Sequence, residues 1–192
     1  HCVVPLNELE DWSGREGGDL EREVNSALNQ ITGSRHTFAG LALDRPRIMG
    51  IVNVTPDSFH DRGRHASIDA AITHGAGLIA AGADAIDIGG ESTRPGSEET
   101  PEELEIERVL PVVRALRGQG AVLSVDTRRT AVMRAALDAG VEVINDITAL
   151  GDDPDALQVA SEARAHVVLM HMQGRPRTMQ RRPRYRHAPY EI

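Results

Sequence analysis

Five apolar segments in this sequence each end abruptly in polar residues. Segment 48–52 is the first, and it runs into Asn53, Thr55, Asp57 and Ser58. The same change occurs at the junctions Gly90–Glu91, Val125–Asp126, Ile144–Asn145 and Met170–His171. Short apolar runs of this kind are typical of buried strands, and α/β enzymes carry their reactive groups just beyond the carboxyl ends of such strands. The repetition predicts a single active-site face.

The segments between these strands have the spacing of amphipathic helices, with apolar residues recurring every three or four positions. Helices are predicted over residues 67–82, 100–116, 127–139 and 153–163. The sequence Thr100-Pro-Glu-Glu103 is that of a capping box with proline at the first helical position. Pro111 is expected to kink the same helix or to end its regular part. Gly140 is the expected C-terminal cap of the predicted helix 127–139.

Alternation of strands and helices with short connections predicts an α/β protein with a parallel sheet. The first strand lacks the Gly-x-Gly-x-x-Gly turn of a dinucleotide-binding fold. Polar residues after every strand favour a (β/α)8 TIM barrel, which needs about 250 residues. The chain has 192 residues, starts at His1 and stops at Ile192. We therefore expect a C-terminally truncated barrel of the first five or so βα units over residues 47–192, preceded by an N-terminal extension, 1–46.

Composition narrows the classes of partner. A net charge of −8 argues against nucleic acid and membrane surfaces as general partners. A local basic run, Arg175, Arg177, Arg181, Arg182, Arg184 and Arg186, is interpreted either as a solvated loop or as a lip that attracts an anionic substrate. No window is apolar enough to span a bilayer. Cys2 is the single cysteine, so no internal disulfide can form and a cytoplasmic location is expected.

The polar junctions carry recognisable motifs. They are Asn53-Val-Thr-Pro-Asp-Ser-Phe59, Gly89-Gly-Glu-Ser-Thr-Arg-Pro-Gly96, Ser124-Val-Asp-Thr127, Ile144-Asn-Asp-Ile147 and Met170-His-Met-Gln-Gly174. In order and spacing, over about residues 47–185, the chain resembles the dihydropteroate synthases of the pterin-binding barrel superfamily. These transferases of folate biosynthesis join 6-hydroxymethyl-7,8-dihydropterin pyrophosphate to para-aminobenzoate and release pyrophosphate.

The resemblance implies roles at the pyrophosphate end of the substrate. Asn53 matches the family's magnesium-contacting asparagine, and a neutral oxygen suits a hard cation. Thr93 and Arg94 match the residues that hold phosphate oxygens, for which a guanidinium offers a bidentate contact. Asp61 matches the acidic residue of the first loop. Arg94 and Asp61 are the catalytic residues that the resemblance implies.

The resemblance also implies contacts to the two rings. Asp126 and Asn145 match the residues that pair with the edge of the pterin, and Met170 the residue that packs on its face. Phe59 and Pro95 match the loop residues that enclose the aminobenzoate ring. Both substrates are small molecules, and family members are homodimers when full length.

Simpler interpretations of the same residues remain open. Asp126 and Asn145 are residue types that commonly cap the helix that follows a strand. Thr93-Arg94-Pro95 has the composition of an ordinary turn. His171 is interpreted as a structural residue, since no set of His, Cys and Asp has the spacing of a zinc site.

The sequence also departs from the family pattern. Where the family reads Ser-Asp-Gly-Gly, this chain has His60-Asp61-Arg62-Gly63. It contains no lysine, so the family's pterin-contacting lysine has no counterpart, and we expect the 192 residues to be inactive alone. Two alternatives follow: a non-catalytic pterin-binding paralogue, and a pterin-dependent methyltransferase relative, which has no need of a pyrophosphate site.

Overall fold

The computed structural model describes residues 37–54, 63–91, 100–174, 179 and 183–187. The chain divides into two units, 1–46 and 47–192. In the first unit a short hairpin pairs β1 (Thr37–Phe38) with β2 (Leu41–Ala42) in antiparallel fashion. Ala39 and Gly40 in its turn have φ values of 48° and 77°, the positive pair that a tight two-residue hairpin turn requires.

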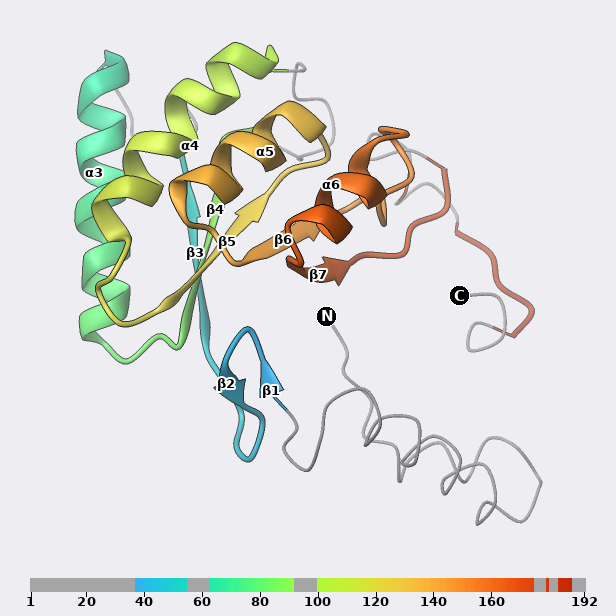
Figure 1. Ribbon diagram of the computed structural model, residues 1–192, viewed down its shortest axis with the longest axis horizontal. Helices are drawn as coiled ribbons and strands as arrows, with labels where there is room; N and C mark the ends of the chain where they lie inside the picture. The colour runs from blue at the N-terminus through green and yellow to red at the C-terminus, as the bar shows by residue number, and fades with distance from the viewer. Residues whose placement is uncertain (1–36, 55–62, 92–99, 175–178, 180–182, 188–192) are drawn as a thin grey trace. The chain divides into compact units, whose positions relative to one another are not determined.

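A parallel sheet of five strands organises the second unit (Figure 1). Its strands are β3 (Met49–Asn53), β4 (Ala85–Gly89), β5 (Val122–Asp126), β6 (Val143–Asp146) and β7 (His166–Leu169). The helices between them are α3 (Gly63–Ala80), α4 (Glu102–Leu116), α5 (Thr130–Ala139) and α6 (Ala156–Glu162). Within the described ranges, every helix is too short or too polar to cross a membrane.

The order of the strands decides between the two α/β architectures. Each strand pairs with its successor in the sequence, from β3 to β7, without a reversal. The four helices cover the same side of the sheet (Figure 1). A doubly wound sheet would reverse its order and carry helices on both faces, whereas a barrel keeps its helices outside. The predicted α/β class and TIM-barrel architecture are confirmed over five consecutive strands.

Helix boundaries show where local signals were insufficient. The capping-box prediction at Thr100 is wrong, because α4 begins after Pro101 without a side-chain cap and the Thr100 N–H donates to Glu91 instead. Pro111 does not end α4, which continues to Leu116. The cap at Gly140 is confirmed, with φ of 106° and its N–H bonded to the carbonyls of the last turn.

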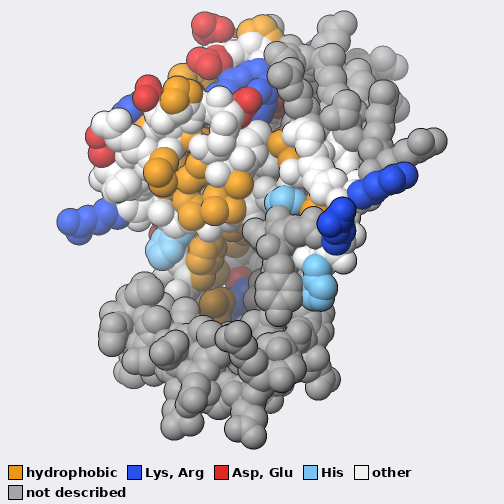
Figure 2. Space-filling view, turned by 90° about the vertical axis from the view of Figure 1, so that its right-hand side faces the viewer, with side chains coloured by type: hydrophobic (Ala, Val, Ile, Leu, Met, Phe, Trp, Pro, Cys, Tyr) orange, Lys and Arg blue, Asp and Glu red, His pale blue; other side chains and the backbone are white. Residues whose placement is uncertain are grey.

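The two faces of the sheet differ in their burial. The helix-covered face holds the apolar core, in which Ile86, Ile88, Leu123, Val125 and Ile144 are at most 2% exposed. On the other face, Met49 and Ile51 of β3 are 39% and 62% exposed. Hydrophobic side chains lie in the open on the face shown in Figure 2. In a barrel this second face is the interior, which side chains from all the strands fill in layers.

Gly90, just beyond β4, provides a test of this packing. A Cβ atom on Gly90 would lie 2.9 Å from Val109 Cγ2 and 3.1 Å from the backbone oxygen of Glu105, both in α4. We expect Gly90→Ala to lower the free energy of unfolding by about 1–3 kcal/mol, because a packed helix must shift. The matched control is Gly77→Ala in α3, where nothing lies within 4 Å and a gain of about 0.5–1 kcal/mol is expected. Denaturant unfolding measures both; equal effects would contradict the packing described.

Candidate functional site

Four residues form one row across the sheet at the carboxyl ends of its strands. Strand pairing aligns Asn53 with Gly89, Gly89 with Asp126, and Asp126 with Asn145. Residues in one row of a parallel sheet project from the same face. A Cβ atom on Gly89 would lie 3.4 Å from Asn53 Oδ1 and 3.6 Å from Asp126 Oδ2. The missing side chain of Gly89 therefore leaves the space between an amide and a carboxylate open.

A buried hydrogen-bonded group lies one step below this row. Ser124 Oγ donates to Asp87 Oδ1 at 2.6 Å, and Asn145 Nδ2 donates to Asp87 Oδ2 at 2.9 Å. Because an ionised carboxylate only accepts, Asp87 fixes which way the Asn145 amide faces. Asn145 is 7% exposed, and its Oδ1 has no hydrogen-bond partner among the described residues. An unpaired buried acceptor costs about 1–3 kcal/mol, so this oxygen is suited to a donor from a ligand.

Burial raises the pKa of two carboxyl groups in the site, Asp126 and Asp87. Burial raises the pKa of Asp126 to about 7, and the charges of Asp87, Glu105, Asp146 and Glu91 add to the effect, in that order. Burial also raises the pKa of Asp87, although its hydrogen bonds from Ser124 and Asn145 oppose the rise. Strongly shifted carboxyl groups are common at functional sites, where desolvation is arranged with specific neighbours.

The interpretation of Asp126 and Asn145 as helix caps is wrong. Helix α5 begins after Arg129 without a side-chain cap, and the N–H of Thr130 donates to Asp153 Oδ2 at 3.2 Å. Asn145 directs its amide to Asp87, and α6 begins only at Ala156. Neither side chain has the local role that would explain its place at a strand end.

The residues that directly follow β7 lie next to the end of β6. Met170 is half-buried, and its N–H donates to the Asp146 carbonyl oxygen at 3.1 Å. His171 Nε2 lies 2.9 Å from the Tyr185 hydroxyl. Within the described ranges, no group of three or more His, Cys, Asp or Glu residues could hold a metal ion. The role of Asn53 as a metal ligand therefore remains a prediction from the sequence.

Five of the residues that the sequence singled out lie outside the described residues: Phe59, Asp61, Thr93, Arg94 and Pro95. The structure brings together the other four, Asn53, Asp126, Asn145 and Met170, at the carboxyl ends of β3, β5, β6 and β7. Their roles toward a ligand remain predictions.

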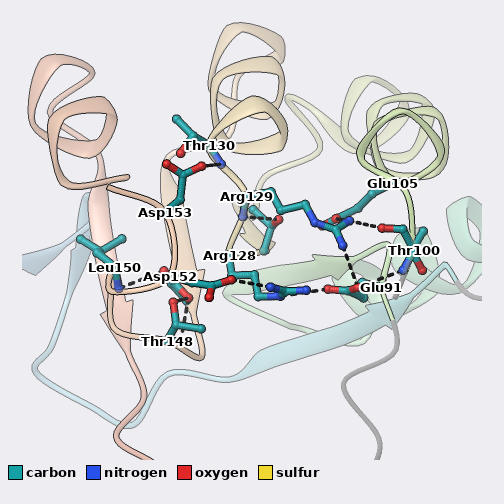
Figure 3. A network of polar contacts seen from close by, with 12 residues as sticks. Glu91, Thr100, Glu105, Arg128, Arg129, Thr130, Thr148, Leu150, Asp152 and Asp153 are labelled. Carbon is teal, nitrogen blue, oxygen red and sulfur yellow. Dashed lines mark hydrogen bonds and ion pairs between the residues drawn. The ribbon is translucent and has the colours of Figure 1, made fainter. Parts of the chain in front are cut away.

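Sequence reasoning missed Asp87 and Ser124, which lie inside strands rather than after them. The available signal was a polar residue in the middle of an apolar strand, since such a group must find a buried partner. It also missed Arg128 and Arg129, which follow Asp126-Thr127. They form ion pairs with Glu91 beyond β4, Glu105 of α4 and Asp152 between β6 and α6 (Figure 3). No local pattern pointed to this arginine pair.

Comparisons with known proteins agree with this geometry. The sequence profile described as "Pterin binding enzyme" matches residues 49–192. The dihydropteroate synthase of Escherichia coli strain K12 is 50% identical over 146 residues, 76% of this chain and 51% of the relative. The chain spans about half the length of the relatives that it matches.

Two solved structures from Xanthomonas albilineans are similar. The dihydropteroate synthase with 4-aminobenzoic acid is 50% identical with a TM-score of 0.72, over 83% of this chain and 57% of that one. The complex with 7,8-dihydropteroate is 52% identical with a TM-score of 0.61, over 68% and 47%.

The raised pKa of Asp126 predicts how stability depends on pH. Because the folded protein binds this proton more tightly than the unfolded chain, ionisation of Asp126 opposes folding. The contribution is fully present below the ordinary value of 3.8 and is lost as pH rises through about 7. Asp126→Asn cannot ionise, so we expect it to raise the free energy of unfolding, relative to wild type, more at about pH 8 than at about pH 5. Denaturant unfolding at both pH values tests this, and a pH-independent effect would contradict a raised pKa of Asp126 in the folded protein.

Proposed function

Since the chain belongs to the pterin binding enzyme family, we propose that the protein of which it is part is a dihydropteroate synthase. The reaction forms a bond between the methylene carbon of 6-hydroxymethyl-7,8-dihydropterin pyrophosphate and the amine of para-aminobenzoate, with release of pyrophosphate and one proton. The observation that carries the proposal is that strand register places Asp126 beside Asn145, whose buried Oδ1 has no hydrogen-bond partner within the described residues. The similarity to synthases from two bacteria supports it.

The row offers acceptors of the kind that a pterin edge needs. The aminopyrimidinone ring presents N–H groups side by side, and buried acceptors recognise them by hydrogen bonding. Asn145 Oδ1 accepts one N–H because Asp87 holds the amide nitrogen turned away. The ionised Asp126 carboxylate accepts another with the added strength of a charge. Met170 packs its thioether against the face of the ring.

The pyrophosphate end calls for a cation and for phosphate donors. Asn53 is an exposed amide at the end of β3, in the row that holds Asp126, and a single neutral oxygen fits Mg²⁺, which keeps several waters and binds mainly through substrate phosphates. When bound, Mg²⁺ neutralises charge on the departing pyrophosphate. Thr93 and Arg94 hold the phosphate oxygens, and stabilising that charge dominates catalysis because the amine needs little activation.

The remaining parts of the proposal concern the second substrate and the setting of the enzyme. Phe59 and Pro95 enclose the aminobenzoate ring, and Asp61 is the acidic group of the first loop. The full-length protein is a cytoplasmic homodimer. Ligand binding that depends on the pyrophosphate group would exclude the methyltransferase alternative, and turnover by the full-length protein would exclude the non-catalytic paralogue.

Calorimetric titration of the full-length protein with the pterin pyrophosphate tests the pterin contact. Asp126→Asn places an N–H donor where the ligand also presents a donor, so we expect a loss of affinity of about tenfold or more. Asp69→Asn makes the same chemical change on the exposed side of α3 and should leave the affinity unchanged. Equal affinities for wild type and Asp126→Asn would remove Asp126 from the ligand site.

A second substitution tests the pyrophosphate end. Arg94→Lys keeps the charge but loses the planar fork, so a bidentate phosphate contact should weaken and turnover should fall by about tenfold or more. If Arg94 only forms a surface ion pair, the change should be nearly silent, because such pairs contribute about 0–1 kcal/mol. Steady-state formation of 7,8-dihydropteroate is the measurement, with circular dichroism as the control for folding. Wild-type turnover in the variant would count against a role for the whole motif 89–96 in binding pyrophosphate.

A further inference from the structure

Asp87 of β4 is a buried carboxylate that joins three neighbouring strands, one step below the row of the candidate site. It is 6% exposed, and Ser124, its strand partner in β5, is fully buried. Ser124 Oγ donates to Asp87 Oδ1 at 2.6 Å, and Asn145 Nδ2 of β6 donates to Asp87 Oδ2 at 2.9 Å. Each carboxylate oxygen therefore accepts a hydrogen bond from a different strand.

These hydrogen bonds make the two orientations of the Asn145 amide unequal. An amide has an acceptor end and a donor end of nearly the same shape, so packing alone does not distinguish them. Rotation of the amide by half a turn would bring its oxygen against the Asp87 carboxylate, where two acceptors would face each other. The orientation that Asp87 permits leaves Oδ1 at the other end of the amide, buried and with no hydrogen-bond partner among the described residues.

Asp87 can influence a ligand only through this amide. Ser124 and Asp126 are two residues apart in β5, so their side chains project from the same face of the sheet. Asp126 is paired with Asn145 in the row, whereas Asp87 is paired with Ser124 one layer beneath it. The carboxylate of Asp87 is bonded to protein groups through both oxygens, and Asn145 is the one of these groups that belongs to the row.

We propose that Asp87 is a positioning residue that sets the ligand preference of the site: because it makes Asn145 present oxygen, the site selects rings whose edge carries an exocyclic amino group and rejects rings with a carbonyl oxygen there. The inference rests on the proposed function, which places the pterin edge against Asp126 and Asn145. Both of these residues then offer acceptors, and a carbonyl oxygen in place of the amino group would leave a buried acceptor unpaired.

Two ring compounds measure the preference. The first is 6-hydroxymethyl-7,8-dihydropterin, and the second is 6-hydroxymethyl-7,8-dihydrolumazine, which has a carbonyl oxygen in place of the 2-amino group. Both are titrated calorimetrically into full-length wild type and into Asp87→Asn. We expect wild type to bind the pterin at least about tenfold more tightly than the lumazine, because an unpaired buried acceptor is costly.

Asp87→Asn should weaken this preference while it keeps the shape of the side chain. Ser124 still donates to the oxygen of residue 87, so the new amide nitrogen faces Asn145 and attracts the Asn145 oxygen. Asn145 then presents its nitrogen to the ring, which disfavours the amino group and favours the carbonyl. We expect the ratio of the two affinities to fall by about tenfold or more.

A swapped pair and a matched control separate orientation from stability. Asp87→Asn combined with Asn145→Asp again pairs one amide with one carboxylate, and the carboxylate at position 145 presents an oxygen in either orientation. The double variant should recover the preference to within about threefold of wild type. Asp84→Asn makes the same chemical change just before β4, where it removes an ion pair with Arg47 of 3.0 Å, and should leave the preference unchanged.

A further variant keeps the test decisive if Asp87→Asn fails to fold. Asp87→Ser replaces the carboxylate with a hydroxyl that can donate as well as accept, so it no longer imposes one orientation on Asn145. The preference for the pterin should fall in this variant too.

Three results would overturn the inference alone. An unchanged preference in the variants of Asp87 would show that Asn145 keeps its orientation without the carboxylate. Equal losses of affinity for the two rings would show a general structural role, and a double variant without recovery would show that the order of donor and acceptor is not the cause. A wild type that does not distinguish the two rings would instead contradict the pterin-edge contact of the proposed function.

Discussion

The in-register parallel pairing of β3 to β6 is the constraint on which the candidate site depends. It aligns Asn53, Gly89, Asp126 and Asn145 in one row although they are far apart in the sequence. Because side chains alternate between the faces of a sheet, a slip of one residue in any strand would turn its polar group toward the helices. The apolar residues of the helix-covered face resist such a slip, so the packing of the core also sets the geometry of the site.

A concentration of carboxylates is the second constraint. Asp87, Glu105 and Asp126 each have a raised pKa, because burial removes the water that would stabilise their charges. Side chains of the protein stabilise the charges of two of these carboxylates. Ser124 and Asn145 donate hydrogen bonds to Asp87, and Arg129 forms an ion pair with Glu105. For Asp126 the largest influences all raise its pKa, which leaves its carboxylate suited to a ligand that brings its own N–H donors.

The sequence was informative where signals are local and not where they are long-range. Apolar runs that end in polar residues located the strands and the functional edge, and Gly140 marked a helix end through its left-handed conformation. The contacts that order the site could not be foreseen, because Asn145 and Asp87 are 58 residues apart and Arg129 and Glu105 are 24 apart. A contact outside the helix also explains why the capping-box prediction at Thr100 is wrong, because the N–H of Thr100 donates to the Glu91 side chain.

The central claim is that one row of the sheet binds the edge of a pterin through Asp126 and Asn145. A crystal structure of the full-length protein with 6-hydroxymethyl-7,8-dihydropterin pyrophosphate tests it most directly. The account predicts ring N–H groups within hydrogen-bonding distance of the Asp126 carboxylate and of Asn145 Oδ1, with Asn145 Nδ2 still bonded to Asp87. A ligand bound elsewhere, or an Asn145 amide turned to present its nitrogen to the ring, would contradict the account.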